Sequence, residues 1–212
     1  MLRGFLKFTF GVLHRLTTLG LSMGPGHFVR YSMYKQLQEH FKVNPVPEGA
    51  TILSISHSRH LIELLTNGFS QVREANYPDF NIFSLPFHDG EFDLVVSDQV
   101  FEHIEGDPQQ AIDETLRVTK QGGRVVHTTC FMIPYHGPGD YWRYTPEGLA
   151  YLCRKASKVD QALGWGHPLL PLISGIGLDQ AGVPEARWHP FHLLAMWNWP
   201  SYSYVVWVVA TK

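Results

Sequence analysis

The chain has 212 residues, of which 44% are hydrophobic and 17% are charged. This balance is typical of a globular protein, and the length suffices for one domain with a full core. The net charge of −2 gives no broad electrostatic reason to expect binding to nucleic acid. The two cysteines, Cys130 and Cys153, do not make a disulfide framework, so we expect buried thiols in a cytoplasmic protein.

Residues 1–20 are expected to form a helix, because apolar residues recur on part of one helical face. Its uncharged stretches are too short for a membrane span, and a secretory signal is not indicated. Two interpretations stay open. The helix packs on the domain or on another subunit of a homo-oligomer, or it rests as a basic amphipathic helix on a membrane surface.

The next segments divide the chain in two. Met23–Gly26 predicts a break, and a second helix is expected from His27 to Phe41. A linker rich in turn residues follows at 44–49. We therefore expect a helical extension over residues 1–46 and an α/β domain over residues 47–212.

The α/β domain begins with alternating apolar runs and turn signals. The predicted elements are a strand at Thr51–Ser56, a helix over Leu61–Leu65 with its C-cap at Asn67-Gly68, short strands at Ser70–Arg73 and Phe80–Phe83, and a buried strand at Phe92–Ser97. Such an order is typical of a parallel sheet, in which ligands bind at the carboxyl ends of the strands.

Two helix starts are marked by a capping residue followed by proline, at Asp107-Pro108 and Thr145-Pro146. The first helix is expected to end near Thr119, and a strand at Arg124–Thr129 follows the Gly-Gly turn. Residues 157–200 have little periodicity. The final segment, Tyr202–Ala210, predicts a strand by its β-branched and aromatic content.

The motifs LPFHDGEFDLVVSDQVFEHI, KQGGRVV and HGPGDYWRYTPEGL lie within this region. Together they resemble the class I S-adenosylmethionine-dependent methyltransferases, and the DYWRYTPEGL loop resembles a subgroup of small members. The resemblance implies a Rossmann-like α/β fold with a mostly parallel seven-stranded sheet whose last strand is antiparallel. It also implies S-adenosylmethionine as cofactor and a small-molecule acceptor, such as a sugar or a biosynthetic intermediate.

The first turn departs from the family pattern of an acid followed by glycines. Ser54, Ser56 and His57 occupy the matching positions. Two interpretations follow. Serine and histidine groups hold the cofactor in place of the glycines, or the scaffold has exchanged methyl transfer for binding, scaffolding or other chemistry.

The resemblance places further cofactor contacts on polar residues at the strand ends. The ribose-side acid corresponds to Asn76, with Glu74 as the nearest carboxylate, and the adenine-side positions are Asn81 and Ile82. After the fourth strand the cofactor positions are Asp98, Gln99 and Val100. For Asp98 a capping role is the alternative.

Candidate acceptor and catalytic residues follow the fourth and fifth strands. Substrate binding is assigned to the loop residues Asp140, Tyr141, Trp142, Arg143 and Tyr144. His136 is the candidate base, because neutral imidazole titrates near physiological pH, and His103 of the EH pair is a second catalytic candidate. Structural roles are the alternatives for His103, Trp142 and Arg143. No histidine spacing matches a metal motif, so no metal site is predicted.

Overall fold

The computed structural model describes residues 2–66 and 71–212. Its centre is a six-stranded sheet in the order β3-β2-β4-β5-β8-β6. The strands are β2 (Thr51–Ile55), β3 (Gln71–Ala75), β4 (Phe92–Asp98), β5 (Thr119–Cys130), β6 (Lys158–Trp165) and β8 (Val205–Thr211). β3, β2, β4 and β5 are parallel, whereas β8 runs antiparallel to both β5 and β6.

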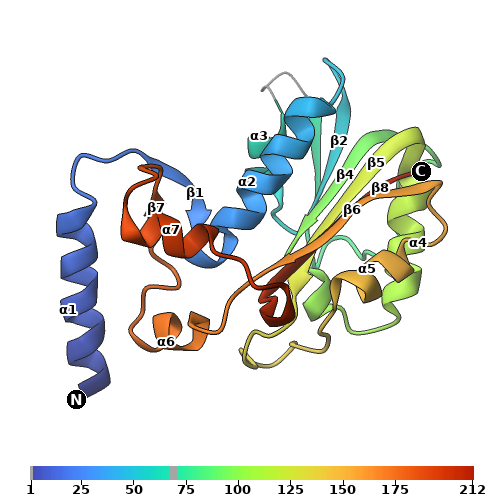
Figure 1. The fold of residues 1–212 in the computed structure, drawn as a ribbon. Helices are drawn as coiled ribbons and strands as arrows, with labels where there is room; N and C mark the ends of the chain where they lie inside the picture. The colour runs from blue at the N-terminus through green and yellow to red at the C-terminus, as the bar shows by residue number, and fades with distance from the viewer. Residues whose placement is uncertain (1, 67–70) are drawn as a thin grey trace.

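Helices cover both faces of this sheet, as the nearly continuous buried runs of β2, β4 and β8 require (Figure 1). One core contains Ile52 and Val96 of the sheet together with side chains of α2 (Phe28–Val43) and α3 (Arg59–Leu65). The other contains Leu53 and Val95 together with side chains of α4 (Pro108–Val118) and α5 (Pro146–Leu152). Both layers therefore hold the carboxyl ends of β2 and β4 in fixed positions.

The predicted capping residues of α4 and α5 are confirmed. The Asp107 side chain accepts a hydrogen bond from the Gln109 amide, and that of Thr145 accepts one from Gly148. Each helix also has proline in its first turn. Cys130 and Cys153 are buried free thiols, and burial raises the pKa of each to about 12.

A small second layer lies beside the sheet (Figure 1). It contains α1 (Leu2–Thr17), β1 (Met23–His27), α6 (Leu170–Gly175), β7 (Gly182–Pro184) and α7 (Pro190–Met196), and a short 3-10 turn, η2 (Pro200–Tyr202), precedes β8. β1 and β7 pair as an antiparallel ribbon. α1 forms the outer edge of the molecule, and no described helix has the length and apolarity needed to cross a membrane.

Three sequence-based expectations were wrong. Within residues 2–66 and 71–212 the central sheet has six strands rather than seven. The predicted strand at Phe80–Phe83 is a turn, with only one isolated bridge, between Asn81 and Ser84. The predicted break at Met23–Gly26 is strand β1, whose partner lies about 160 residues away in the chain.

Other boundaries shifted by a few residues. The helix expected over residues 1–20 ends at Thr17, and the last strand begins at Val205. The C-cap expected at Asn67-Gly68, and the first residue of the strand expected at Ser70–Arg73, lie outside the described residues. α2 belongs to the same core as the sheet, and the domain boundary at residue 46 stays a prediction.

Candidate active site

The turn after β2 adopts a backbone conformation that glycine favours, although it contains no glycine. Ser56 and His57 have φ values of 50° and 64°, in the left-handed region. The Ser56 amide donates to the Ala75 carbonyl at 3.0 Å, and the His57 amide donates to Asn76 Oδ1 at 2.8 Å. Contacts to the end of β3 therefore hold this turn in the glycine-type geometry.

Ser58 joins the ends of β2 and β4. Its hydroxyl donates to the Ile55 carbonyl at 2.5 Å and accepts from the Asp98 amide at 2.7 Å. Ser54, one of the predicted cofactor residues, is fully buried within β2, and its hydroxyl has no partner among the described residues. The Ser54 side chain is therefore closed to solvent, although the residue lies next to the last of β2.

Asp98 is held by three side chains at the end of β4. Its carboxylate accepts hydrogen bonds from Tyr34 at 2.5 Å, Arg30 at 3.0 Å and Thr128 at 2.5 Å. Only 8% of the Asp98 side chain is exposed. Burial and the neighbouring carboxylate raise the pKa of Tyr34, which keeps its phenol a donor. The contacts dock α2 on the strand end.

The first cavity, cavity A, lies over the ends of β2, β3 and β4 and has a volume of about 500 Å³. This size is typical of a pocket for a small ligand. Its walls are mostly apolar and aromatic, with a few polar groups. They comprise Ile55, Ser56, Ala75, Tyr77, Phe80, Asn81, Ile82, Phe83, Leu85, Gln99, Val100, His103, Ile104, Glu105, Gly139 and Tyr141.

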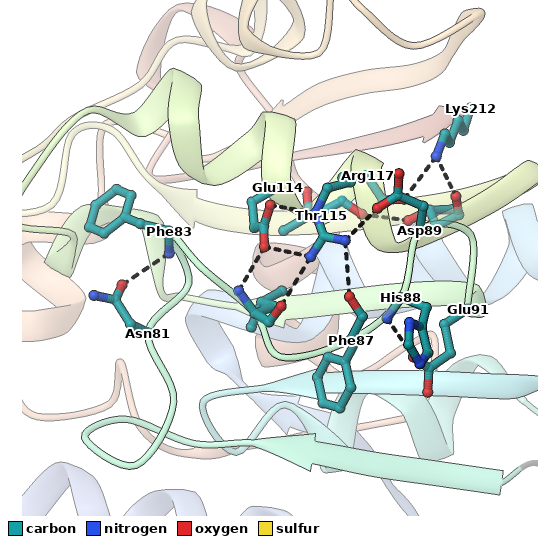
Figure 2. Close-up of polar contacts among 12 residues, drawn as sticks. Asn81, Phe83, Phe87, His88, Asp89, Glu91, Glu114, Thr115, Arg117 and Lys212 are labelled. Carbon is teal, nitrogen blue, oxygen red and sulfur yellow. Dashed lines mark hydrogen bonds and ion pairs between the residues drawn. The ribbon is translucent and has the colours of Figure 1, made fainter.

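The loop that forms one wall of cavity A is fixed by α4 (Figure 2). Arg117 donates to the carbonyls of Leu85 and Phe87 at 3.0 and 2.9 Å and pairs with Asp89. Glu114 accepts from the Leu85 amide at 2.7 Å and from Arg117. These pairs raise the pKa of Arg117 and lower that of Glu114, so both stay charged at neutral pH.

A second cavity, cavity B, lies beside the first over β5 and β8 and has a volume of about 530 Å³. Its lining has more charged and titratable side chains and comprises His27, Val29, Arg30, Gln99, Glu102, His103, Cys130, Ile133, Pro134, Tyr135, His136, Ser174, Asp179, Gln180, Tyr204 and Val205. Gln99 and His103 line both cavities. The two cavities therefore meet at residues that follow β4.

His103 and His136 form a pair at this junction. His103 Nδ1 lies 2.8 Å from the Gly139 carbonyl, and His136 Nδ1 lies 3.2 Å from a carboxylate oxygen of Asp140. Both partners only accept hydrogen bonds, which assigns a hydrogen to each Nδ1 atom. The two Nε2 atoms, 3.4 Å apart, are then both acceptors when the pair is neutral. The two acceptor nitrogens therefore face each other where the cavities meet.

The loop after β5 is built around Asp140 and Arg143. The Asp140 side chain is inaccessible to solvent and forms a bidentate pair with Arg143, while Arg143 also donates to the Ile133 carbonyl. The pKa of Asp140 lies far below its usual range. The hydrogen bonds from Arg143 and from the His136 amide lower it, and so does the charge of Arg143. Asp140 thus remains a carboxylate and orients His136.

The remaining loop residues point in different directions. Tyr141 lines cavity A and is half exposed. Trp142 donates to the Ile104 carbonyl at 2.8 Å, and the buried Tyr144 hydroxyl donates to the Phe101 carbonyl at 3.4 Å. Trp142 and Tyr144 therefore hold the loop against the segment after β4 and line neither cavity.

Glu74, Asn76 and His57 form a polar group at the rim, outside the cavity walls. Asn76 Nδ2 donates to Glu74 at 3.0 Å, and Arg59 lies 3.5 Å from the same carboxylate. The Asn76 hydrogen bond lowers the pKa of Glu74. Asn81 and Ile82 line cavity A, where the Asn81 side chain accepts from the Phe83 amide.

Sequence reasoning missed several residues of the site. Arg30 and Tyr34 reach Asp98 from a helix that the sequence assigned to the extension. Glu102 is a buried carboxyl that lines cavity B and accepts from Thr129 at 2.8 Å. Burial raises the pKa of Glu102, and Asp98 adds to this effect. Phe80 and Phe83 could have been assigned to the site from the sequence, because they lie beside the LPF motif. Asp179 could not, because it lies in a stretch without periodicity.

The residues that line cavity A fit a nucleoside. Its apolar and aromatic walls suit a flat base, and the Asn81 amide supplies a polar edge. A small-molecule pocket over the carboxyl ends of parallel strands defines a cofactor-binding α/β protein.

The model of a methyltransferase domain family matches residues 21–127, about half of the chain. The chain belongs to this family and has the class I methyltransferase fold, whose cofactor is S-adenosylmethionine. The DYWRYTPEGL subgroup stays a prediction.

Two curated relatives are similar over short regions. An uncharacterized 37.1 kDa transposon protein of Streptomyces fradiae is 30% identical over 81 residues, which cover 38% of this chain and 23% of the relative. An uncharacterized methyltransferase of Schizosaccharomyces pombe is 32% identical over 88 residues, which cover 38% of this chain and 31% of the relative. The chain thus matches less than a third of the length of either relative.

Solved structures share the fold at low identity. A phosphoethanolamine N-methyltransferase of Haemonchus contortus, in complex with S-adenosylmethionine, has a TM-score of 0.58 and 14% identity over 93% of this chain and 55% of its own. A methyltransferase of Archaeoglobus fulgidus has a TM-score of 0.54 and 11% identity, covering 87% and 98%. The [4+2]-cyclase SpnF has a TM-score of 0.50 and 12% identity, covering 100% and 95%.

Proposed function

We propose that the chain catalyses methyl transfer to a small polar acceptor, a sugar or a biosynthetic intermediate, that binds in cavity B. The observation that carries this proposal is the junction of two cavities at Gln99 and His103. An electrophilic methyl group is what S-adenosylmethionine supplies when bound. Donor and acceptor in adjoining cavities are held for in-line displacement, and such positioning lowers the barrier by several kcal/mol, about 7 at the low end.

Cavity A would hold the nucleoside of the cofactor. Ile82 and Val100 would contact the base, and the Asn81 side chain would form a hydrogen bond with its polar edge. The turn after β2, which contains Ser56 and His57, would lie along the sugar. Gln99, fixed by Thr128 at 3.1 Å, would separate the two ligands. Asp98 would act through α2 and Gln99, because its carboxylate already accepts hydrogen bonds from three side chains.

The His103–His136 pair would accept the proton that an acceptor hydroxyl or amine loses. Both imidazoles line cavity B, and their facing Nε2 atoms are unprotonated in the neutral pair. Asp140 and the Gly139 carbonyl stabilise the charge that forms. Arg30 and the carboxyl groups of Glu102 and Asp179 supply donors and acceptors that suit a hydroxylated acceptor.

Calorimetry with S-adenosylmethionine and S-adenosylhomocysteine tests the first part of this proposal. We expect heat of binding and a rise in melting temperature with either ligand. Release of S-adenosylhomocysteine, measured over a panel of sugars and hydroxylated intermediates, tests the second part. Absence of both heat and thermal shift at millimolar cofactor would reject the methyltransferase proposal.

Variants test the histidine pair. His136→Gln and His103→Gln should each lower turnover by about 100-fold while cofactor binding is retained. The matched control is His88→Gln, since His88 is exposed and lines neither cavity. If His136→Gln turned over as fast as the control, the histidine pair would have no part in the mechanism.

A second candidate function is binding, scaffolding or other chemistry at a repurposed cofactor site. The absence of glycine and acid at Ser54, Ser56 and His57 favours it, and the fold itself permits it, as the likeness to a cyclase illustrates. Cofactor binding without turnover on any acceptor would support this candidate.

A further inference from the structure

The outer face of α1 is apolar and faces solvent. Phe5, Phe8, Leu13 and Leu16 are 65%, 73%, 53% and 67% exposed, and Leu19 just beyond the helix is 81% exposed. Single exposed apolar residues are ordinary, but here they recur at helical spacing on one side. The face therefore requires either a partner or a lipid surface.

The opposite face of α1 already has its partner within the chain. His14 Nε2 lies 2.9 Å from the Gly182 carbonyl, and its ring contacts Phe191 edge to face at 4.8 Å between centroids. The Lys7 methylenes cover Gly177, where an added Cβ would come within 3.0 Å. The apolar outer face is thus presented by a helix that is docked on the body of the protein.

The charge of this part of the chain favours an anionic partner. Five Lys and Arg residues and no Asp or Glu precede Glu39 in the sequence. Two of the five, Arg30 and Lys35, pair with Asp98 and Glu185. The other three, Arg3, Lys7 and Arg15, belong to α1, and Arg15, seven residues after Phe8, lies beside the apolar face. An apolar face bordered by cationic side chains is typical of helices that lie in the plane of an anionic membrane.

We propose that α1 binds the surface of an anionic lipid bilayer through this face. The apolar side chains enter the boundary between headgroups and acyl chains, and Arg15 beside them contacts lipid phosphates. The segment under α1, which contains Gly177 and Gly182, also contributes Ser174 and Asp179 to the wall of cavity B. Binding through α1 therefore brings that wall close to the membrane.

Co-sedimentation of the full chain with vesicles tests this proposal. We expect pelleting with vesicles of phosphatidylcholine mixed with phosphatidylglycerol, much weaker pelleting with phosphatidylcholine alone, and a decrease as salt is raised. The variant with Phe8→Ser, Leu13→Ser and Leu16→Ser should lose at least about tenfold in partitioning. The matched control carries Val43→Ser and Tyr151→Ser, at residues 79% and 67% exposed elsewhere.

A second variant keeps the test independent of the apolar substitutions. Arg15→Glu reverses one charge and should weaken binding to anionic vesicles while the binding to neutral ones stays unchanged. Failure of the wild-type chain to pellet with anionic vesicles would overturn the proposal, and so would an equal loss in the control variant. Light scattering that shows a dimer converted to monomer by the triple serine variant would identify a protein interface instead and would equally overturn it.

Discussion

The His57 amide donates a hydrogen bond of 2.8 Å to the side chain of Asn76. This contact links the turn after β2 to the end of β3, the two places where the family resemblance implies glycines and an acid. The asparagine side chain bonds the turn with its oxygen and Glu74 with its nitrogen. An amide suits both tasks, whereas a carboxylate has no donor for Glu74.

Replacing Asn76 by Asp should therefore destabilise the protein, although it restores the residue type implied for the family. The new carboxylate would lie about 3 Å from that of Glu74, with a cost of about 1 kcal/mol at neutral pH. The loss should shrink as pH falls toward 4 and the carboxyls protonate. Chemical denaturation at several pH values measures this, with Asn76→Ala as the control that lacks the repulsion. A pH-independent loss identical to that of alanine would contradict the interpretation.

Replacing His57 by Gly should stabilise the fold. His57 has a φ of 64°, which costs a non-glycine residue about 1–2 kcal/mol, and the greater chain entropy of glycine offsets about half of this. We expect a net gain of about 0.5–1 kcal/mol, seen as a higher melting temperature. Cofactor affinity, measured by calorimetry, should also rise.

His57→Ala is the matched control for this change, because alanine removes the imidazole and keeps the strain. It should be no more stable than the wild type. If His57→Gly leaves the affinity unchanged or lower, the imidazole itself has a role in the site.

The sequence predicted those elements whose signals are local. The N-caps at Asp107 and Thr145 depend on residues within one turn, and β4 is identified by its buried apolar run. The antiparallel last strand followed from β-branched residues and the family resemblance. The predicted strand at Phe80–Phe83 failed because these apolar side chains form a cavity wall rather than a sheet face.

Contacts between distant segments were beyond sequence reasoning. Arg30 and Asp98 are 68 residues apart, and neither side chain carries a local signal of the pair. Likewise, the pairing of β1 with β7 depends on a stretch with little periodicity. The candidate histidines could be chosen by residue type and place, but their 3.4 Å contact required the positions of two separate loops.

Replacing Arg117 by Ala should loosen the loop that forms one wall of cavity A. The change removes the hydrogen bond to the Phe87 carbonyl shown in Figure 2 and the one to the Leu85 carbonyl. Because Arg117 is one-third exposed, we expect a modest loss of stability of about 1–2 kcal/mol. Binding of S-adenosylmethionine should weaken by about tenfold, since the wall is no longer preorganised.

Arg117→Lys separates the geometry of the guanidinium from its charge. A single ammonium cannot bond both carbonyls and Glu114 together, so this variant should resemble alanine rather than the wild type. Lys155→Ala, which removes an exposed pair with Asp113, is the control and should leave affinity unchanged. Full affinity in Arg117→Lys would mean that charge alone fixes the loop.

Replacing Glu102 by Gln should make the protein more stable than the wild type by an amount that grows with pH. Burial raises the pKa of Glu102, so the folded state binds its proton more tightly than the unfolded chain does. The wild type therefore loses stability as pH rises above about 4.5, the usual value for glutamate, up to the raised pKa of the folded state.

Glutamine keeps an oxygen that accepts from Thr129 and does not ionise. Thermal unfolding of both proteins from pH 4 to pH 8 measures the difference, which should be smallest at the acidic end. A difference that is constant or shrinks with rising pH would mean that Glu102 is ionised in the folded protein at no cost.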